Sequence, residues 1–498
     1  MNQIDIDKFL NLFVYDKKSP ILFNTGFFLI LFLFFYAGYL LLRNRQRGRI
    51  IYVILFSYFF YYKSSGIYFL ILIGSTIVDY FLSHLINDSL SKARKSFYLV
   101  FSLVLNLGML AYFKYTNFFL DIFHDLYTSI FSSSGSLDFK HYDIFLPVGV
   151  SFFTFQSLSY TIDVYRGNIK PLNSIIDYGF FVSFFPQLVA GPIVRATDFL
   201  PQIHKKPFLS NEDLGKALFL IMAGLIKKAV ISDYISGNFV DRVFDNPMLY
   251  SPFENFGAMY GYALQIYCDF SGYSDMAIGI ALLLGFHLPV NFNAPYVSGS
   301  ITEFWRRWHI SLSSWLKDYL YISMGGNRRG KIRTYINLFL TMLLGGLWHG
   351  ASLKFIIWGG LHGTALAVEK AFQSIVKLRP RKWLRIVSVL ITFHFVCFCW
   401  IFFRAKDFTI AGQLISQAAI FMKSGGEFLK IIDAYKDVFA LIVFGFIIHF
   451  IPKRFKEMGQ RIFTKSHPFI KAIILTLVIY LVIQTMSADV KPFIYFQF

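Results

Sequence analysis

Residues 20–49 read PILFNTGFFLILFLFFYAGYLLLRNRQRGR. Positions 20–42 are almost entirely apolar, and arginine then occupies every second position from 43 to 49. A helix needs about 20 mostly apolar residues to cross a bilayer, and basic residues gather at its cytoplasmic end. The stretch therefore predicts a membrane-spanning helix that enters the cytoplasm after residue 42.

The rest of the chain has the same character. Of its 498 residues, 56% are hydrophobic and 15% are charged, whereas soluble globular proteins are about 45–50% apolar and about 25% charged. The formal net charge of +19 would suggest nucleic acid in a soluble protein. Because the basic residues lie mostly in short loops between apolar runs, they indicate membrane topology, and we expect no nucleic-acid partner.

Further apolar runs predict an all-α, polytopic integral membrane protein with about 12 spans. We expect these spans at 20–42, 50–62, 67–86, 97–118, 144–166, 214–240, 259–285, 333–350, 353–373, 386–403, 438–451 and 469–486. If the N-terminus lies outside, the basic clusters at 43–49, 92–95, 328–333, 377–385 and 453–461 all fall on the cytoplasmic side. Both chain ends are then extracytoplasmic.

Two segments do not read as simple spans. Residues 178–196 contain Pro186, Gly191 and Pro192, and we interpret them as re-entrant or interfacial. Broken backbone at membrane depth is tolerated only where it is buried in protein or lines a cavity. Residues 286–332 mix polar and aromatic side chains and predict amphipathic helices that enter from the cytoplasmic face. The whole chain, 1–498, is predicted to be a single membrane domain, with core motifs at about 145–365 and C-terminal spans at 386–486.

His349 is the sharpest candidate for chemistry. It lies in GGLWHG, residues 345–350, at the outer end of an apolar run. Histidine can move protons near neutral pH, and ionisable residues within spans are costly enough to suggest function. The alternative is a buried histidine that makes one structural hydrogen bond between tightly packed helices.

His309 ends the run FWRRWH, residues 304–309. Arg306 and Arg307 also fit an interfacial belt in which basic side chains reach toward water. His309 fits that interpretation less well, because it lies between Trp308 and an isoleucine. His362 gives no His-Glu-x-x-His pattern with His349, so no metal site is expected.

Two carboxylates, Asp269 and Asp275, fall within one predicted span. Six residues of helix turn by about 240° net, so the two do not share a helix face. Pairing with arginine or with helix ends is therefore favoured over a catalytic acid pair.

Six motifs occur in order along the chain: PVGVSFFTFQ (147–156), FPQLVAGPIVR (185–195), DFSGYSD (269–275), PVNFNAPY (289–296), FWRRWH (304–309) and GLWHG (346–350). In this order they resemble the membrane-bound O-acyltransferase superfamily, in its branch of bacterial alginate O-acetyltransferases and D-alanyl-lipoteichoic acid transferases. The resemblance covers about residues 20–420, and the tail beyond it adds little.

The resemblance implies helices around a central tunnel in a bacterial cytoplasmic (inner) membrane. It implies no bound cofactor, a cytoplasmic acyl thioester donor such as acetyl-CoA, and a polysaccharide acceptor outside. It also implies a separate exported partner, either serine hydrolase-like or single-span. His349 matches the near-invariant histidine of the family, and His309 matches its second polar position. Substrate or tunnel support is expected from Trp348, Trp308, Arg306, Asn291, Asp269, Gln156 and Arg195.

The resulting hypothesis makes His349 the general base for an acceptor hydroxyl and His309 the group that holds the donor carbonyl or the thiol. On the predicted topology a line between the two histidines crosses the membrane. Three alternatives stay open: a transporter or flippase in which Asp79, Asp163, Asp269 and His349 line a path, an acyltransferase with a lipid acceptor, and a non-catalytic scaffold.

Overall fold

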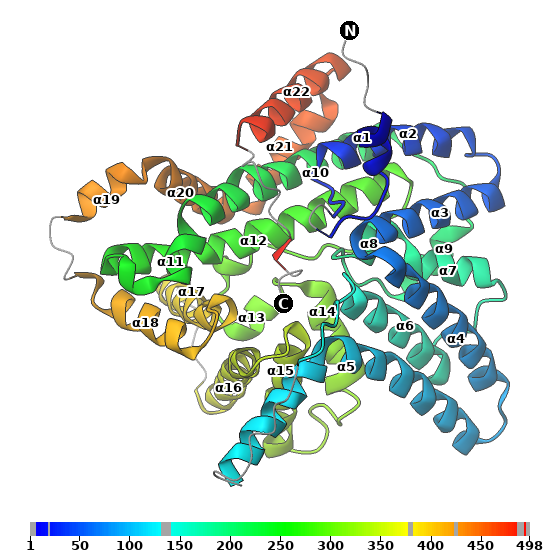
Figure 1. Ribbon diagram of the computed structural model, residues 1–498, viewed down its shortest axis with the longest axis horizontal. Helices are drawn as coiled ribbons and strands as arrows, with labels where there is room; N and C mark the ends of the chain where they lie inside the picture. The colour runs from blue at the N-terminus through cyan, green and yellow to red at the C-terminus, as the bar shows by residue number, and fades with distance from the viewer. Residues whose placement is uncertain are drawn as a thin grey trace. The chain divides into compact units, whose positions relative to one another are not determined.

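The computed structural model describes residues 6–17, 20–130, 141–376, 382–422, 427–485 and 493–494 (Figure 1). Every regular element within these residues is a helix, so the all-α prediction is confirmed. Residues 377–381 of one basic cluster, residue 486 of the last predicted span and both extreme chain ends lie outside the described residues.

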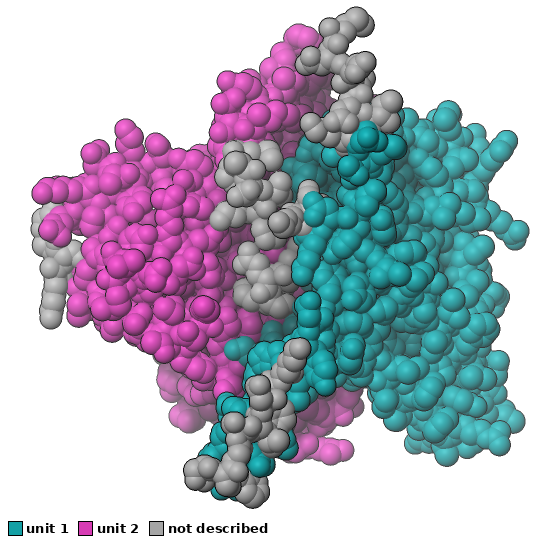
Figure 2. Space-filling model, in the orientation of Figure 1, with its two compact units in different colours: residues 1–207, 350–352 teal, residues 208–349, 353–498 magenta. Residues whose placement is uncertain are grey.

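The chain divides into two compact units (Figure 2). Unit 1 comprises residues 1–207 and 350–352, and unit 2 comprises residues 208–349 and 353–498. The single membrane domain expected for residues 1–498 stays a prediction.

Unit 1 is built from nine described α-helices: α1 Ile6–Asn11, α2 Gly26–Leu41, α3 Gln46–Ser65, α4 Phe69–Asp88, α5 Lys92–Ile130, α6 Val150–Tyr165, α7 Ile175–Ser183, α8 Phe185–Leu188 and α9 Ala196–Ile203. Phe185 lies in its aromatic core, where its ring centroid is 5.0 Å from that of Phe56 and 5.7 Å from that of Phe60. The break at Phe184 between α7 and α8, in a wholly buried segment, agrees with the interrupted backbone predicted for 178–196.

Unit 2 contains the remaining α-helices: α10 Asn211–Leu225, α11 Asp241–Asp245, α12 Pro252–Leu283, α13 Ile301–Trp305, α14 Ile310–Trp315, α15 Lys331–His349, α16 Leu353–Ile375, α17 Lys382–Arg404, α18 Phe408–Ala419, α19 Phe428–Ala434, α20 Lys436–Phe450, α21 Lys453–Lys465 and α22 Pro468–Thr485. Helix α12 begins with a capping box, in which Ser251 and Glu254 satisfy each other's backbone N–H groups. Beside it, α10 continues through π-helical turns at 226–233 and 236–240.

Four helical stretches among the described residues are long and apolar enough to cross a bilayer: Gln46–Asp88, Lys92–Ile130, Lys382–Arg404 and Pro468–Thr485. A fifth is added if α20 and α21, bent by 96° relative to each other, count as one span. The chain is therefore an integral membrane protein. The buried helices of unit 2 are less uniformly apolar, since α12 carries Asp269 and Asp275, and the figure of about 12 spans stays a prediction.

The segment 286–332 differs from its prediction as a set of amphipathic helices. Its described α-helices, α13 and α14, have only five and six residues. Trp308 is 1% exposed and His309 is fully buried. The segment packs into unit 2, because its aromatic side chains find partners on α16 and α17.

Candidate active site

Helices α15 and α16 pack closely at positions where both carry glycine. A Cβ atom on Gly346 would collide with the backbone of Phe355 and Gly359, and one on Gly359 would collide with the backbone of Met342. Small residues of this kind let membrane helices pack at close range. The contact sets Trp358 of α16 against His349, the last residue of α15.

His349 is enclosed by aromatic rings. Its ring centroid lies 5.0 Å from those of Trp348 and Trp358 and 5.3 Å from that of Phe403 on α17, each in an edge-to-face arrangement. The residue is 3% exposed. Packing from three helices therefore fixes where the imidazole lies.

His309 has an unusual backbone conformation. Its φ of 41° and ψ of 56° are left-handed, which a side chain with a Cβ adopts at an energetic cost and which clusters at functional sites. Its Nδ1 accepts a hydrogen bond from the backbone N–H of Leu312 at 3.4 Å, so the neutral ring carries its proton on Nε2. Burial lowers the pKa of His309 to about 3, which keeps the ring neutral at physiological pH.

Asn291 holds the turn that carries His309. Its backbone carbonyl accepts from the N–H of Ile310 at 2.9 Å. Its side-chain oxygen accepts from the N–H and the hydroxyl of Ser311 at 3.2 and 3.0 Å, and its amide donates to Ser274 of α12 at 3.3 Å. One buried amide thus ties the strained turn to a long helix.

Histidine and tryptophan rings alternate in a row through unit 2. The ring centroids of His309 and Trp348 are 6.4 Å apart, and those of Trp348 and His349 are 5.0 Å apart. Trp358 then separates His349 from His362, at 5.0 and 4.9 Å. The expectation that the line from His309 to His349 crosses the membrane is wrong, because these two steps are far shorter than a hydrocarbon core of about 30 Å.

A cavity of about 440 Å³ opens beside this row. Its walls include Trp305, Arg306, Ile310, Lys317, Met342 and Lys370. Trp305 also contacts the ring of His362 at 5.2 Å, and Ile310 directly follows His309. Neither His309 nor His349 lines the cavity itself. Three cationic side chains therefore meet an apolar wall that adjoins His309 along the chain and His362 in space.

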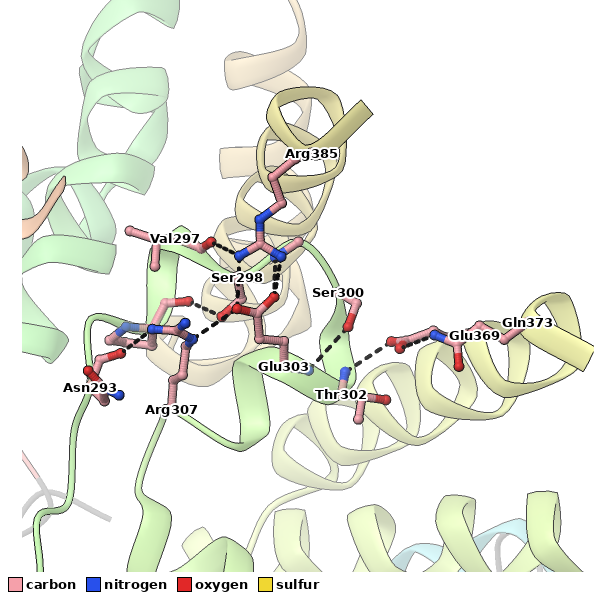
Figure 3. A network of polar contacts seen from close by, with 12 residues as sticks. Asn293, Val297, Ser298, Ser300, Thr302, Glu303, Arg307, Glu369, Gln373 and Arg385 are labelled. Carbon is pink, nitrogen blue, oxygen red and sulfur yellow. Dashed lines mark hydrogen bonds and ion pairs between the residues drawn. The ribbon is translucent and has the colours of Figure 1, made fainter. Parts of the chain in front are cut away.

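Glu303 fastens α13 to a neighbouring helix (Figure 3). Its carboxylate accepts from both terminal nitrogens of Arg385 at 2.6 and 2.8 Å and from Nε of Arg307 at 3.0 Å. The Arg385 guanidinium holds the pKa of Glu303 at about 2, well below its usual value. Glu369 of α16 adds a second tie by accepting from the backbone N–H of Thr302 at 2.9 Å.

Comparison with known proteins identifies the family. The sequence pattern of the membrane-bound O-acyltransferase family matches residues 168–408, which include His309, His349 and the walls of the cavity. A peptidoglycan O-acetyltransferase of Helicobacter pylori is 39% identical over 374 residues, which cover 70% of this chain and 69% of that protein. The chain belongs to the membrane-bound O-acyltransferase family.

Two further relatives are similar to this chain and have different acceptors in their names. A probable alginate O-acetylase of Pseudomonas aeruginosa is 43% identical over 353 residues, or 70% of this chain and 65% of that protein. A teichoic acid D-alanyltransferase of Bacillus subtilis is 32% identical over 282 residues, or 52% of this chain and 69% of that protein. The chain thus spans slightly less than two thirds of the Pseudomonas protein.

The two aspartates of the motif at 269–275 both form ion pairs. Asp269 pairs with Lys228 at 2.5 Å, and Asp275 pairs with Lys227 at 2.6 Å. Structural pairing was favoured from the sequence, but the partners are lysines of the π-helical segment after α10, not arginines. The wider π turn places two consecutive lysines against α12.

The remaining motif residues serve different parts of the O-acyltransferase. Trp308 packs against Phe292, Phe304 and Trp400, with centroids 4.9–5.7 Å away, so it supports the turn that carries His309. Gln156 belongs to unit 1, where its amide donates to the carbonyl of Phe181 at 2.6 Å. Arg195, also in unit 1, occupies the N-cap position of α9, and its side chain makes no capping hydrogen bond there.

Sequence reasoning missed several contributors to the site. Trp358 and Trp400 lie outside the six motifs, yet their rings lie 5.7 Å apart beside His349. The tail after residue 420 also reaches the site: His449 accepts from the N–H of Tyr296 at 3.1 Å, and the N–H of Ile494 donates to Asp269 at 2.9 Å. A histidine within an apolar run was the only available signal for His449.

Proposed function

We propose that this chain catalyses O-acetylation, moving an acetyl group from a cytoplasmic acyl thioester to a hydroxyl group of an extracytoplasmic polysaccharide. The family and the names of the relatives, which are O-acetyltransferases of alginate and peptidoglycan, support this proposal. The observation that carries it is the buried row from His309 through Trp348 to His349, with a cation-lined cavity alongside.

In the proposed reaction His349 removes the proton from the acceptor hydroxyl, and the oxygen attacks the thioester carbonyl carbon. The carbon–sulfur bond breaks, and the leaving thiolate takes the proton back from the imidazolium. General bases of this kind contribute about 10²–10⁴-fold to the rate. The edge-to-face rings of Trp348, Trp358 and Phe403 would fix the angle at which His349 meets the hydroxyl.

His309 has a different proposed role. Burial lowers the pKa of His309 to about 3, so His309 is a weak base and stays uncharged at neutral pH. Its remaining N–H group can then act as a hydrogen-bond donor. The proton on its Nε2 would hold the thioester carbonyl and stabilise the negative charge that develops on the oxygen. Asn291 would act as a positioning residue, because it reaches His309 only through the turn.

The donor is proposed to bind in the cavity of about 440 Å³. Arg306, Lys317 and Lys370 line it, and no ion pair joins them to a carboxylate among the described residues. Phosphates of a donor such as acetyl-CoA would supply the missing negative charge. The apolar wall that includes Trp305 would shield the thioester from water.

The proposal includes the predicted topology of about 12 spans, with both termini outside and the basic clusters in the cytoplasm. The acetyl group would reach the polysaccharide with the help of a separate exported partner, serine hydrolase-like or single-span. A transporter is less well supported, because Asp79 accepts hydrogen bonds from Ser102 and Asn106 and Asp269 pairs with Lys228, so these carboxylates already have partners.

The test uses protein in liposomes with radiolabelled acetyl-CoA on the cytoplasmic-facing side and a panel of glycans, with and without a candidate partner. We expect His349→Ala to lower label transfer by at least about 10²-fold. His394→Ala is the matched control, because His394 is an exposed histidine of the same unit. Normal transfer by His349→Ala would refute its role as base, and movement of an unmodified glycan without labelling would favour a transporter.

The donor cavity has its own test. Lys317→Gln/Lys370→Gln is expected to raise KM for acetyl-CoA about tenfold, the effect of losing about 1.4 kcal/mol of binding, with little change in kcat. An acetyl thioester without phosphates is the control donor, and its KM should not change. Equal effects on both donors would argue against phosphate binding at these lysines.

A further inference from the structure

A second basic cavity lies in unit 1, where α2 ends, α3 begins and α9 ends. It has a volume of about 200 Å³, and its walls include Arg43, Gln46, Arg49, His204, Lys205 and Lys206. No residue of the six motifs and none of the proposed catalytic groups lines it. The cavity therefore needs an explanation apart from acyl transfer.

The positive charges of this cavity are uncompensated. Among the described residues no carboxylate pairs with Arg43, Arg49, Lys205 or Lys206, and no aspartate or glutamate lines the cavity. Four like charges around one small space repel one another. A bound anion would relieve that repulsion.

Of the four cationic side chains in this cavity, Arg49 most strongly indicates a bound anion. It is 2% exposed, whereas Arg43, Lys205 and Lys206 are exposed. Among the described residues, the one hydrogen bond of its side chain runs from Nη2 to the carbonyl of Lys205 at 3.3 Å. The other N–H donors of this buried guanidinium are therefore available to the cavity. Buried guanidinium groups normally have a charged partner.

The start of α3 strengthens the positive potential. Arg45, at the N-cap, gives no side-chain hydrogen bond to the first turn of this 20-residue helix. The backbone N–H groups there, together with the helix dipole, favour an anion. Gln46, the first residue of the helix, lines the cavity.

A larger cavity adjoins the basic one. It has a volume of about 620 Å³ and shares Gln46 and His204 with its neighbour. Its walls include Ile50, Tyr80 and Ile176 together with the charged Arg47 and Asp177. His204 stands between the two, with Nδ1 2.7 Å from the Gln46 amide and Nε2 3.0 Å from Asp177. Leu41, two residues before Arg43, is 86% exposed, so lipid-facing helix surface begins directly beside the basic cavity.

We infer that unit 1 binds an anionic glycerophospholipid, with the phosphodiester in the basic cavity between Arg43, Arg49, Lys205 and Lys206. The glycerol and the start of an acyl chain lie toward the adjoining cavity with its isoleucine and tyrosine side chains. The topology predicted from the arginines places this site in the cytoplasmic leaflet, where anionic lipids and basic pockets meet. The inference does not depend on the proposed acetyl transfer.

The test compares two charge-matched triple variants of the full chain, purified in a neutral detergent. Arg43→Gln/Lys205→Gln/Lys206→Gln removes three exposed charges of the cavity, and Lys92→Gln/Arg94→Gln/Lys95→Gln removes three from the start of α5, which does not line it. Native mass spectrometry follows retained lipid, and thermal melting follows titration with phosphatidylglycerol, phosphatidylcholine or inorganic phosphate.

We expect phosphatidylglycerol to bind at least tenfold more weakly to the cavity variant than to wild type and the α5 variant, and phosphatidylcholine to protect none of them. Equal binding to both variants would overturn the site, because a pure topology signal treats both clusters alike. Protection by inorganic phosphate that matches that by phosphatidylglycerol would overturn the lipid and leave a free-anion site. If the triple variant does not fold, Lys206→Gln alone supplies the comparison.

Discussion

The two histidines of the candidate site are held in different ways. His349 ends a 19-residue helix, and apolar rings from three helices surround it. His309 lies in a strained turn between helices of five and six residues, held by the Asn291 amide and, further back, by the Glu303 carboxylate. Ring packing positions His349, whereas His309 combines ring packing, with Phe270 at 4.6 Å, and a turn that is held by hydrogen bonds.

The difference follows from the local backbone. A long helix satisfies its own polar groups, so its end can be placed by close contact with a neighbour. A turn leaves backbone N–H groups without helical partners, and in a buried site these must be satisfied by side chains. Mutations in the helix contact that supports His349 should therefore have different effects from mutations in the hydrogen-bonded turn that supports His309.

The largest effect is expected where packing is closest. Gly359→Ala places a Cβ against the backbone of Met342, whereas Gly360→Ala meets only ordinary contacts, the nearest at 3.7 Å. Overpacking costs about 1–3 kcal/mol, and two backbones cannot easily move apart. We expect Gly359→Ala to lower the melting temperature and to abolish most acetyl transfer, because Trp358 moves with α16.

The matched Gly360→Ala variant should be neutral or slightly more stable, since alanine exceeds glycine in helix propensity by about 1 kcal/mol. The two variants differ by one position on the same helix and by the same added methyl group. Equal melting temperatures would show that contact between α15 and α16 does not position His349.

A smaller effect is expected at the polar support. Asn291→Ala removes the acceptor for the N–H and the hydroxyl of Ser311 and leaves a buried N–H without its partner, at a cost of about 1–3 kcal/mol. The helices around the turn remain, so the protein should fold. We expect kcat to fall about tenfold with little change in KM for the donor, the effect of about 1.4 kcal/mol.

Asn293→Ala is the matched control, because Asn293 is exposed and bonds Arg307 through its backbone atoms. Its kcat should stay at the wild-type value. A loss of donor binding in Asn291→Ala, with kcat intact, would mean that the turn serves the cavity rather than the reacting carbonyl.

Much of this site could be predicted from the sequence, because its main candidates stand out by residue type within short stretches. His349 within an apolar run and His309 within FWRRWH stand out by residue type, and glycines beside His349 indicate close helix contact. The fold class follows from apolar composition. The interrupted segment at 178–196 follows from its prolines and glycine, which break the backbone at a recognisable place.

The features that could not be predicted from the sequence depend on contacts between segments that are distant along the chain. The separation of His309 and His349 was overestimated because the helices of 286–332 were expected to enter from the cytoplasmic face as amphipathic elements, whereas Trp308 and His309 are buried within unit 2. The lysine partners of Asp269 and Asp275 depend on a π-helical turn, which has no simple sequence signature. His449 and Ile494 join the site from a tail without motifs.

The smallest effect is expected at the outermost support of His309. Glu303→Gln keeps the shape of the side chain but removes its charge opposite Arg385 and Arg307, pairs that are partly exposed and worth about 0.2–1 kcal/mol each. Arg385 is the main cause that lowers the pKa of Glu303 from 4.5 to about 2 in the folded protein. The stability from this charge is therefore fully present above about pH 4.5 and is lost as the pH falls toward about 2.

Melting curves of wild type and Glu303→Gln should accordingly differ by a small, constant amount near neutral pH and converge as the pH falls below 4.5. Glu369→Gln is the matched control, because Glu369 accepts the N–H of Thr302 and forms no ion pair among the described residues. A glutamine oxygen can also accept that bond, so Glu369→Gln should show no difference in melting temperature from wild type that disappears as the pH falls. A gap for Glu303→Gln that persists down to pH 2 would mean that α13 is held by the shape of its contacts and that charge contributes nothing to positioning His309.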